Sequence, residues 1–308
     1  MRIARRQTSD GPRLAALAGD DLVDLDTTAD LTALLADDGA LAEAAETALR
    51  LRRQVTPMAE AELLAPLQPA TFRDFSTFYE HVNGISGGRV PPEFFEIPTF
   101  YFSNPYAITG PHADIAVPPG STLFDFELEV GAVIGRPGRD LTVDEAGAHI
   151  AGFVIVNDFS ARDTQFHEMR MGLGPAKGKD SATSLGTLFV TVDELAEHRS
   201  GLSYDLRMEV RVNDRLIGGD TLASMSWTFE ALVAYAARGT EVRPGDLLGS
   251  GTCQNGCLAE LWGRHGRDHL PPLAPGDVVT TTVTGLGETR NRIVPGPAAH
   301  PIVPWRTA

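Results

Sequence analysis

Three acidic residues, Asp125, Glu127 and Glu129, alternate with apolar residues in the run from 124 to 130. Successive side chains of a β-strand point to opposite faces, so a strand here would place the three carboxylates on one face. Carboxylates held close together raise one another's pKa unless a cation lies among them. The run therefore indicates either a divalent cation site or a half-exposed strand with a solvated acidic face.

Two other segments carry side chains of related chemistry. The apolar residues 154–156 are followed by Asn157 and Asp158, and Asp158 is either an oxygen ligand or a turn former. Asp74 and His81 are seven residues apart, which places both on one face if the segment is helical. The alternatives are a helix N-cap for Asp74 and an ordinary helix histidine for His81. Four acids without clustered thiolates suit Mg²⁺, Mn²⁺ or Ca²⁺ rather than structural zinc.

Two motifs that could carry other chemistry do not support it. Cys253 and Cys257 are the only cysteines in 308 residues, so a disulfide framework is excluded and we predict a structural role for both. The glycine-rich segment 172–179 lacks the spacing of a phosphate-binding loop, and Asp180 follows its last lysine. We therefore predict no nucleotide site.

The elements that position these residues are expected to be mainly β-strands. From about residue 70, short apolar runs alternate with Gly and Pro, which predicts an α+β fold, mainly β, with a curled or barrel-like core and helices at its ends. The strands are expected at 123–134, 149–158, 187–192, 206–212, 247–251 and 277–283, and the helices near 75–82, 144–149 and 229–237.

Residues 1–68 differ from the rest of the chain. Short strand-like pieces at 1–5, 13–17 and 21–25 precede a helical stretch at 32–51, and Pro66 and Pro69 mark a boundary. We predict a small N-terminal α/β domain over 1–68, for packing or dimerisation, and a catalytic domain over 69–308.

The charge balance limits the class of partner. The chain has 26 Lys and Arg against 41 Asp and Glu, a net charge of −15. Such a surface repels phosphates and anionic lipids, so we expect neither nucleic acid nor a membrane as partner. The apolar runs are short and the basic start lacks an apolar signal region, so a cytoplasmic location is expected.

Taken together and in order, eight segments resemble the fumarylacetoacetate hydrolase family. They are RDFSTFYEH at 73–81, FDFELEVGAVIG at 124–135, NDFSARDTQ at 157–165, GPAKGKD at 174–180, RPGDLLGSGT at 243–252, LAELWG at 258–263, PGDVV at 275–279 and GLGETRNRIV at 285–294. The resemblance implies a mixed β-roll core, a homodimer and, as in many members, a small N-terminal domain.

The resemblance also implies a ligand set for the cation. The aspartate that opens the family's first motif matches Asp74, the glutamates of its Glu-x-Glu strand match Glu127 and Glu129, and the aspartate of its Asn-Asp signature matches Asp158. Phe159 stands where that signature has tryptophan. On this assignment Asp125 is a neighbour of the site rather than a ligand.

Catalytic positions carry over in the same way. His81 matches the histidine that activates water, and Glu260 matches a glutamate in a late strand that orients it. The implied oxyanion donors are Arg162, Gln165 and Lys179, with Lys177 as an alternative to Lys179. Implied contacts with substrate are made by Tyr101 and Thr252.

Departures from the family pattern concern the far end of the substrate. Ser76 and Met169 stand where fumarylacetoacetase has tyrosines, and the segment between Thr252 and Glu260 is shorter. Residues 86–93 form either a lid over the site or a plain surface loop, and within them Arg89 is a candidate for binding a substrate carboxylate.

The predicted function is a Mg²⁺-dependent (or Mn²⁺- or Ca²⁺-dependent) hydrolase that cleaves a C–C bond in a β-diketo acid or acylpyruvate. Water activated by His81 attacks a carbonyl, and the cation stabilises the enolate leaving group. The alternatives are a keto-acid decarboxylase or a dienoate isomerase or hydratase on the same framework, and a member that binds a keto acid without turnover.

Overall fold

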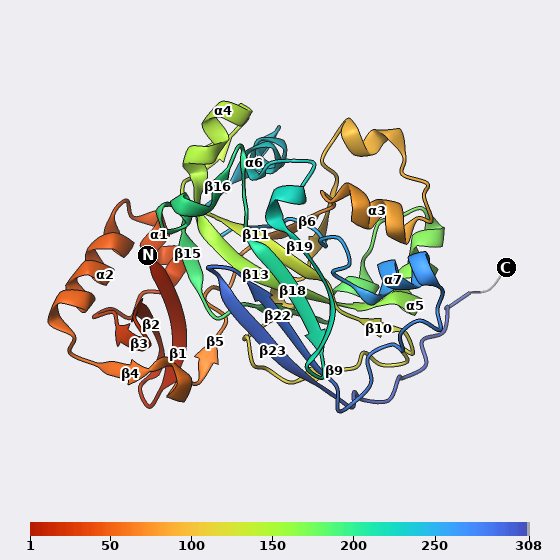
Figure 1. Ribbon diagram of the computed structural model, residues 1–308, viewed down its shortest axis with the longest axis horizontal. Helices are drawn as coiled ribbons and strands as arrows, with labels where there is room; N and C mark the ends of the chain where they lie inside the picture. The colour runs from red at the N-terminus through yellow and green to blue at the C-terminus, as the bar shows by residue number, and fades with distance from the viewer. Residues whose placement is uncertain (307–308) are drawn as a thin grey trace.

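The computed structural model describes residues 1–306, in which two mixed β-sheets pack face to face (Figure 1). The larger sheet runs in the order β4-β3-β2-β1-β15-β13-β11-β21-β6-β7, with β5, β8, β10 and β14 as side branches. Its strands are β1 Arg2–Thr8, β2 Gly11–Ala18, β3 Asp21–Asp24, β4 Val55–Pro57, β5 Leu63–Leu64, β6 Phe72–Phe75, β7 Phe100–Ser103, β8 Ile108–Thr109, β10 Phe124–Asp125, β11 Leu128–Ile134, β13 Ile150–Ala161, β14 Ala182–Leu185, β15 Phe189–Thr191 and β21 Leu247–Gly249.

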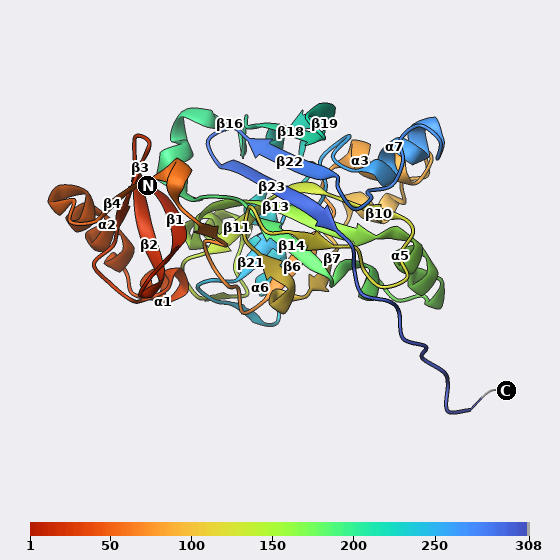
Figure 2. The same cartoon turned by 90° about the horizontal axis from the view of Figure 1, so that it is seen from below.

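The smaller sheet has five strands in the order β19-β18-β22-β23-β9 and lies across β11 and β13 of the larger sheet (Figure 2). Within residues 1–306 both sheets are open, so the core is a mixed β-roll and not a closed barrel. The strands of this sheet and of two short ribbons are β9 Ile115–Ala116, β18 Arg207–Val212, β19 Arg215–Thr221, β22 Val278–Val283 and β23 Gly287–Val294, β12 Gly138–Arg139 with β20 Glu241–Val242, and β16 Arg199–Ser200 with β17 Ser203–Tyr204.

The helices surround the sheets and cover their ends. The α-helices are α1 Leu31–Ala36, α2 Ala40–Leu51, α3 Tyr79–Ile85, α4 Val143–Ala146, α5 Arg162–Glu168, α6 Phe229–Ala237 and α7 Leu258–His265. The 3-10 turns are η1 Met58–Glu60, η2 Pro92–Phe95, η3 Pro105–Ala107, η4 Gly147–His149, η5 Met169–Met171, η6 Lys177–Lys179, η7 Val192–His198 and η8 Leu222–Ser224.

The central strand β13 explains how the core is built. Its residues from Gly152 onward are buried, as expected for a nearly continuous apolar run with structure on both faces. In contrast, β22 buries every second residue, which is the pattern of a strand with one face on the core. Val130, Ile155, Met208 and Val279 belong to one apolar cluster that joins the two sheets.

Residues 1–68 lie at one end of the molecule, at the left of Figure 1. Strand β1 pairs antiparallel with β15, where Ile3 faces Phe189, so the larger sheet continues into this segment. The helical stretch expected over 32–51 is confirmed as two helices, α1 and α2, which are separated before Ala40 by Gly39, whose φ of 83° is a left-handed conformation that glycine adopts readily. The domain boundary at residue 68 stays a prediction.

Two expected elements near the acidic residues differ in the structure. The helix near 75–82 begins only at Tyr79, because Phe72–Phe75 form β6, so Asp74 and His81 do not share a helix face. The strand expected over 123–134 is interrupted at Phe126 and Glu127. The helix expected over 229–237 is confirmed as α6, and its N-cap Thr228 accepts a hydrogen bond from the backbone of Ala231.

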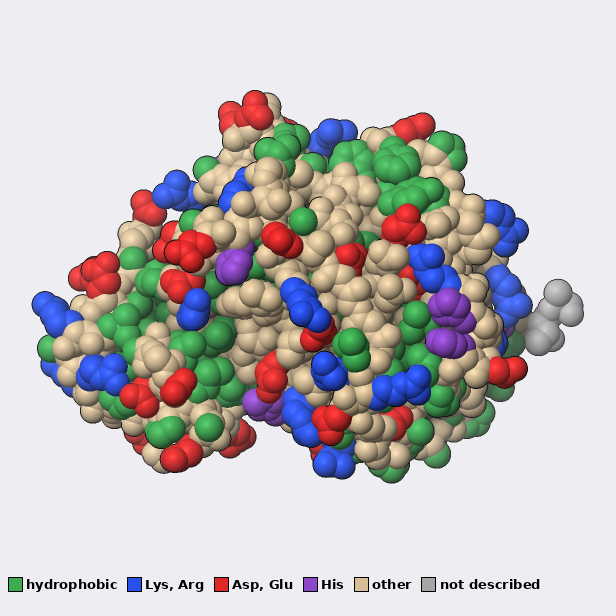
Figure 3. Space-filling model, viewed as in Figure 1, with side chains coloured by type: hydrophobic (Ala, Val, Ile, Leu, Met, Phe, Trp, Pro, Cys, Tyr) green, Lys and Arg blue, Asp and Glu red, His purple; other side chains and the backbone are tan. Residues whose placement is uncertain are grey.

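Charged side chains of both signs are spread over the face of the molecule shown in Figure 3. None of the helices among residues 1–306 has the length and apolar character needed to cross a membrane. Both cysteines are buried free thiols, in agreement with the structural role predicted for them.

Candidate active site

Four carboxylates meet at neighbouring strands of the larger sheet. Asp74 comes from β6, Glu129 from β11, Asp158 from β13, and Glu127 from the interruption just before β11. Strand β21 runs between β6 and β11, and Gly249 of β21 pairs with Asp74. A side chain at Gly249 would collide with Asp74 Oδ1 and lie 3.1 Å from Glu129 Oε2. Glycine at this position therefore lets two carboxylates face each other across the middle strand.

Two donor groups contact this carboxylate cluster. The hydroxyl of Tyr101 lies 2.7 Å from Asp74 Oδ2 and 2.7 Å from Asp158 Oδ2. One hydroxyl has one proton to donate, so only one of these oxygens can accept from it. The ammonium of Lys179 lies 2.9 Å from Asp158 Oδ2 and also contacts Glu127 Oε2. Four carboxylates thus meet two donor groups, of which only the Lys179 ammonium carries a positive charge.

Burial and mutual repulsion shift the pKa values of the cluster. Burial and the nearby Asp158 raise the pKa of Asp74 to about 7, and burial with Asp74 and Glu127 raises that of Glu129 well above its usual range. Burial would also raise the pKa of Glu127, but Lys179 and Arg162 lower it below its ordinary value. Without a cation, the pair Asp74 and Glu129 therefore holds a proton near neutral pH.

The donor set fits a hard divalent cation. When both carboxylates are ionised, Asp74 Oδ1 and Glu129 Oε2 are buried and lack a hydrogen-bond partner within the described chain. One ligand oxygen each from Asp74, Glu127 and Asp158 lies within 4.8 Å of the others. Buried oxygens without partners are costly, and coordination of Mg²⁺, Mn²⁺ or Ca²⁺ by carboxylates would satisfy them.

The predicted pair His81 and Glu260 forms where helices α3 and α7 cross. His81 Nδ1 lies 3.0 Å from Glu260 Oε2, and Glu260 is fully buried. A side chain at Gly84 of α3 would lie 2.5 Å from Glu260 Cγ, and one at Gly263 of α7 would meet the Gly84 carbonyl oxygen. The two glycines therefore let the helices approach closely enough for the pair to form.

Glu260 is held from three sides. Its Oε1 accepts from Arg264 Nε at 2.8 Å, and its Oε2 accepts from the backbone of Asn255 at 2.8 Å as well as contacting His81. The expectation that Glu260 lies on a late strand is wrong, because Cys257 caps α7 and Glu260 is in its first turn. With Nδ1 of His81 engaged by this carboxylate, Nε2 is the ring nitrogen available to a water molecule.

Asp125 points away from the other acidic residues and organises the site from behind. It accepts from Arg162 Nε at 2.8 Å and from the first two backbone N–H groups of α7 at 2.8 and 2.9 Å. Arg162 then reaches Glu127 Oε1 at 2.7 Å and donates to Gln165 Oε1 at 2.9 Å. The interruption at Phe126 takes Asp125 off the face that Glu127 and Glu129 were expected to share with it. That Asp125 is a neighbour of the site rather than a ligand stays a prediction.

A cavity of ≈ 460 Å³ brings most of the predicted site residues together. Asp158 and Glu260 lie behind its wall, and Thr252 Oγ1 contacts Glu129 Oε1 at 3.4 Å. Lys179 faces the cavity, whereas Lys177 is exposed and pairs with Asp180 at 2.8 Å. The predicted residues that line the cavity are Asp74, His81, Tyr101, Glu127, Glu129, Arg162, Gln165, Lys179 and Thr252.

Sequence comparison agrees with this geometry. The family profile described as "Fumarylacetoacetate (FAA) hydrolase C-terminal" matches residues 70–294. The chain belongs to the fumarylacetoacetate hydrolase family. It is 27% identical over 299 residues to the fumarylacetoacetase of Oryza sativa subsp. japonica, an alignment that covers 78% of this chain and 70% of that protein.

Other proteins that are similar to this chain have names that refer to different activities. It is 28% identical to human "Oxaloacetate tautomerase FAHD2A, mitochondrial", over 86% of this chain and 79% of the relative. A solved structure described as a putative HpcE protein from Mycobacterium smegmatis is similar with a TM-score of 0.76 and 27% identity, over 96% of this chain and 100% of that one. Membership of the family therefore identifies the fold and indicates an enzyme, but it does not identify the reaction.

Arg89 lies outside the cavity lining of this family member. It is exposed, and its backbone N–H donates to Ser86 Oγ at 3.1 Å. Its predicted role, like that of residues 86–93 as a lid, stays a prediction. The contact that sequence reasoning missed is that of Arg264 with Glu260, although the spacing of four residues on one helix face was a usable signal.

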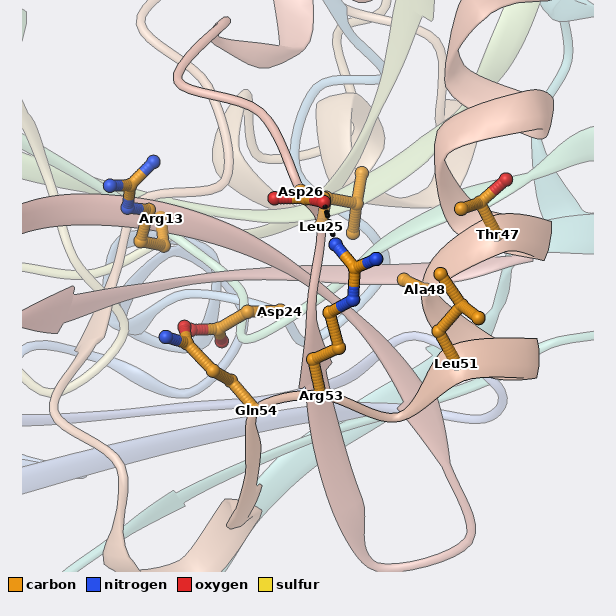
Figure 4. Close-up of a pocket in the computed structure, with 9 residues that line it drawn as sticks. All are labelled: Arg13, Asp24, Leu25, Asp26, Thr47, Ala48, Leu51, Arg53 and Gln54. Carbon is orange, nitrogen blue, oxygen red and sulfur yellow. Dashed lines mark hydrogen bonds and ion pairs between the residues drawn. The ribbon is translucent and has the colours of Figure 1, made fainter.

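A second cavity, of ≈ 140 Å³, lies among the N-terminal elements (Figure 4). Its two carboxylates are paired, because Arg53 Nη1 lies 2.5 Å from Asp26 Oδ2 and Arg6 binds both oxygens of Asp24 at 2.7 Å, while Arg13 donates to the backbone carbonyl of Thr27 at 3.2 Å. These paired charges give the cavity no chemistry comparable to that of the larger one.

Proposed function

We propose that the protein is a divalent-cation-dependent hydrolase that cleaves a C–C bond in a β-diketo acid or acylpyruvate, with Mg²⁺ as the expected cation. The observation that carries the proposal is the 3.0 Å contact between His81 Nδ1 and Glu260 Oε2, beside the buried carboxylates Asp74, Glu127 and Glu129. A general base oriented by a carboxylate is the group that a water-dependent cleavage needs.

The chain's own residues divide the reaction between them. His81 Nε2 takes a proton from water, while Glu260 fixes the ring and stabilises its charged form. The resulting hydroxide adds to the carbon of the distal carbonyl group. Lys179, Gln165 and Arg162 supply hydrogen-bond donors for the negative charge that develops on the carbonyl oxygen. The C–C bond then breaks with its electron pair on the departing carbon, which regains a proton from His81.

The cation would be held by Asp74, Glu127, Glu129 and Asp158, with Tyr101 and Thr252 beside the substrate. When bound, it supplies a template and Lewis acid for two substrate oxygens. Removing it with a chelator is expected to abolish turnover, and Mg²⁺ or Mn²⁺ is expected to restore it.

A second candidate is a tautomerase or isomerase, which the names of relatives favour. Such a reaction needs His81 or another base to move a proton within the substrate, and no water is consumed. The two candidates differ in the products, because a hydrolase yields two acids and an isomerase a product of unchanged mass.

The test measures the ultraviolet loss of an acylpyruvate with Mg²⁺, with the products identified by mass. His81→Ala is expected to abolish the cleavage while cation binding is retained, and His269→Ala, which changes an exposed histidine, serves as the matched control. Full hydrolysis by His81→Ala would refute the role of this base. A product of unchanged mass would favour the isomerase.

The predicted homodimer and cytoplasmic location belong to this proposal. Light scattering that returns a mass near that of one 33.0 kDa chain would refute the dimer.

A further inference from the structure

The larger cavity has a polar end and an apolar end. The carboxylates, His81, Lys179 and Arg162 occupy the polar end described above. Apart from Phe75, the apolar side chains of the lining come from three segments, namely helix α3, strand β7 and the stretch from α5 to η6. We call their apolar side chains the distal wall, which consists of Val82, Ile85, Phe100, Phe166, Met169 and Pro175.

The distal wall is supported by packing on one side and open to a ligand on the other. The Phe100 ring lies 5.0 Å from that of Phe75 and 6.1 Å from that of Tyr235, which fixes its orientation. Phe166 and Met169 are 39% and 45% exposed, although both line the cavity. An apolar ligand would cover surface that these side chains now present to water, which favours its binding.

Among the described residues that line the cavity, none at the distal wall carries a positive charge. Among the described residues, the cations that line the cavity are Lys179 and Arg162, and both are buried in contact with carboxylates at the polar end. Arg170, near the distal wall in sequence, is paired with His167 at 2.6 Å and is not part of the lining. A carboxylate against the distal wall would lose water without gaining a partner, which is costly.

We propose that the substrate carries an uncharged, apolar acyl group at the end that meets the distal wall, so that acylpyruvates with alkyl or aryl tails are preferred to dicarboxylic ones. This inference rests on the proposed function for the chemistry at the polar end. The distal wall alone determines the preference between tails.

The experiment compares hexanoylpyruvate with adipoylpyruvate, which differ only in a terminal methyl group against a terminal carboxylate. With Mg²⁺ present, kcat/KM is expected to be at least ~10-fold higher for hexanoylpyruvate. Met169→Arg adds a cation to the distal wall and is expected to reduce or reverse this ratio. Met171→Arg adds the same charge at a residue that is 80% exposed and outside the lining, and is expected to leave the ratio unchanged.

Equilibrium binding separates this inference from the proposed function. Calorimetry with His81→Ala and Mg²⁺ measures the affinity for each compound without turnover, and the same ~10-fold preference for hexanoylpyruvate is expected. If the intact enzyme cleaves neither compound but His81→Ala binds hexanoylpyruvate more tightly, the hydrolase proposal fails and the apolar preference stands. Equal or tighter binding of adipoylpyruvate, or no binding of either compound, overturns the preference.

Discussion

Replacing Asp74 by asparagine should stabilise the metal-free protein while removing a cation ligand. Asp74 has a pKa of about 7 in the fold against its ordinary 3.8, mainly because it is buried and faces Asp158. A raised pKa means that the folded protein favours the neutral acid, so ionisation of Asp74 lowers the free energy of unfolding. This loss is absent below the ordinary pKa of 3.8, grows as the pH rises, and is complete above about pH 7. At ~1.4 kcal/mol for each pKa unit, that cost reaches ~4 kcal/mol.

An asparagine side chain cannot ionise, so the substitution removes this cost and keeps the shape. In the presence of a chelator, Asp74→Asn is expected to raise the free energy of unfolding by up to ~4 kcal/mol at about pH 8, and by less than half of that at about pH 5. With Mg²⁺ the advantage should shrink, because the intact cluster gains stability from cation binding and the variant loses a ligand.

Urea unfolding followed by circular dichroism at both pH values gives the required free energies. Asp20→Asn changes an exposed aspartate in the turn between β2 and β3 and is the matched control, for which no effect is expected at either pH. A gain for Asp74→Asn that does not grow between pH 5 and 8, or a loss that grows with pH, would refute the electrostatic reasoning.

Four further outcomes are expected. Glu260→Gln should lower kcat by ~10²–10⁴-fold with a smaller effect on KM, measured in steady-state assays, because the base loses its oriented tautomer. Gly84→Ala should lower both Tm and kcat, since its Cβ would lie 2.5 Å from Glu260 Cγ; unchanged values would show that the helices can separate at little cost. Asp125→Ala should cost ~3–5 kcal/mol in urea unfolding, because it removes one carboxylate partner of a buried guanidinium and the acceptor of two backbone N–H groups of α7. Cys253 and Cys257, whose pKa values burial raises, should not react with a chromogenic disulfide until the protein unfolds.

The strands and the meeting of the four carboxylates were the predictable part of this molecule. Apolar runs with Gly and Pro between them located β13, β15, β18 and β22 to within a few residues, since burial on one or both faces leaves a clear pattern. The meeting of Asp74, Glu127, Glu129 and Asp158 followed from family resemblance, and the strand order that brings them together could not be read from spacing alone.

The errors have local causes. A strict two-residue alternation placed Asp125 with Glu127 and Glu129, but the chain breaks strand geometry at Phe126 so that Asp125 can bind Arg162 and the start of α7. Glu260 was expected on a strand because the family resemblance placed its counterpart there, whereas in this chain Cys257 caps a helix that begins at Leu258. Of the distal wall, only Met169 was expected to lie near the substrate; the other side chains could not be predicted, because they come from segments that only the fold brings together.

The base and the carboxylates are built on different parts of the fold, and this separation bears on how new activities arise. Three of the four clustered carboxylates belong to strands of one sheet and Glu127 lies directly before one of these strands, while His81 and Glu260 belong to two helices that cross at Gly84 and Gly263. A substitution at the helix crossing can therefore change or silence the base without disturbing the sheet. Under the proposed function, a few substitutions in this helix pair would therefore be enough to replace C–C cleavage by proton transfer while the carboxylate cluster is kept, both in evolution and in protein engineering.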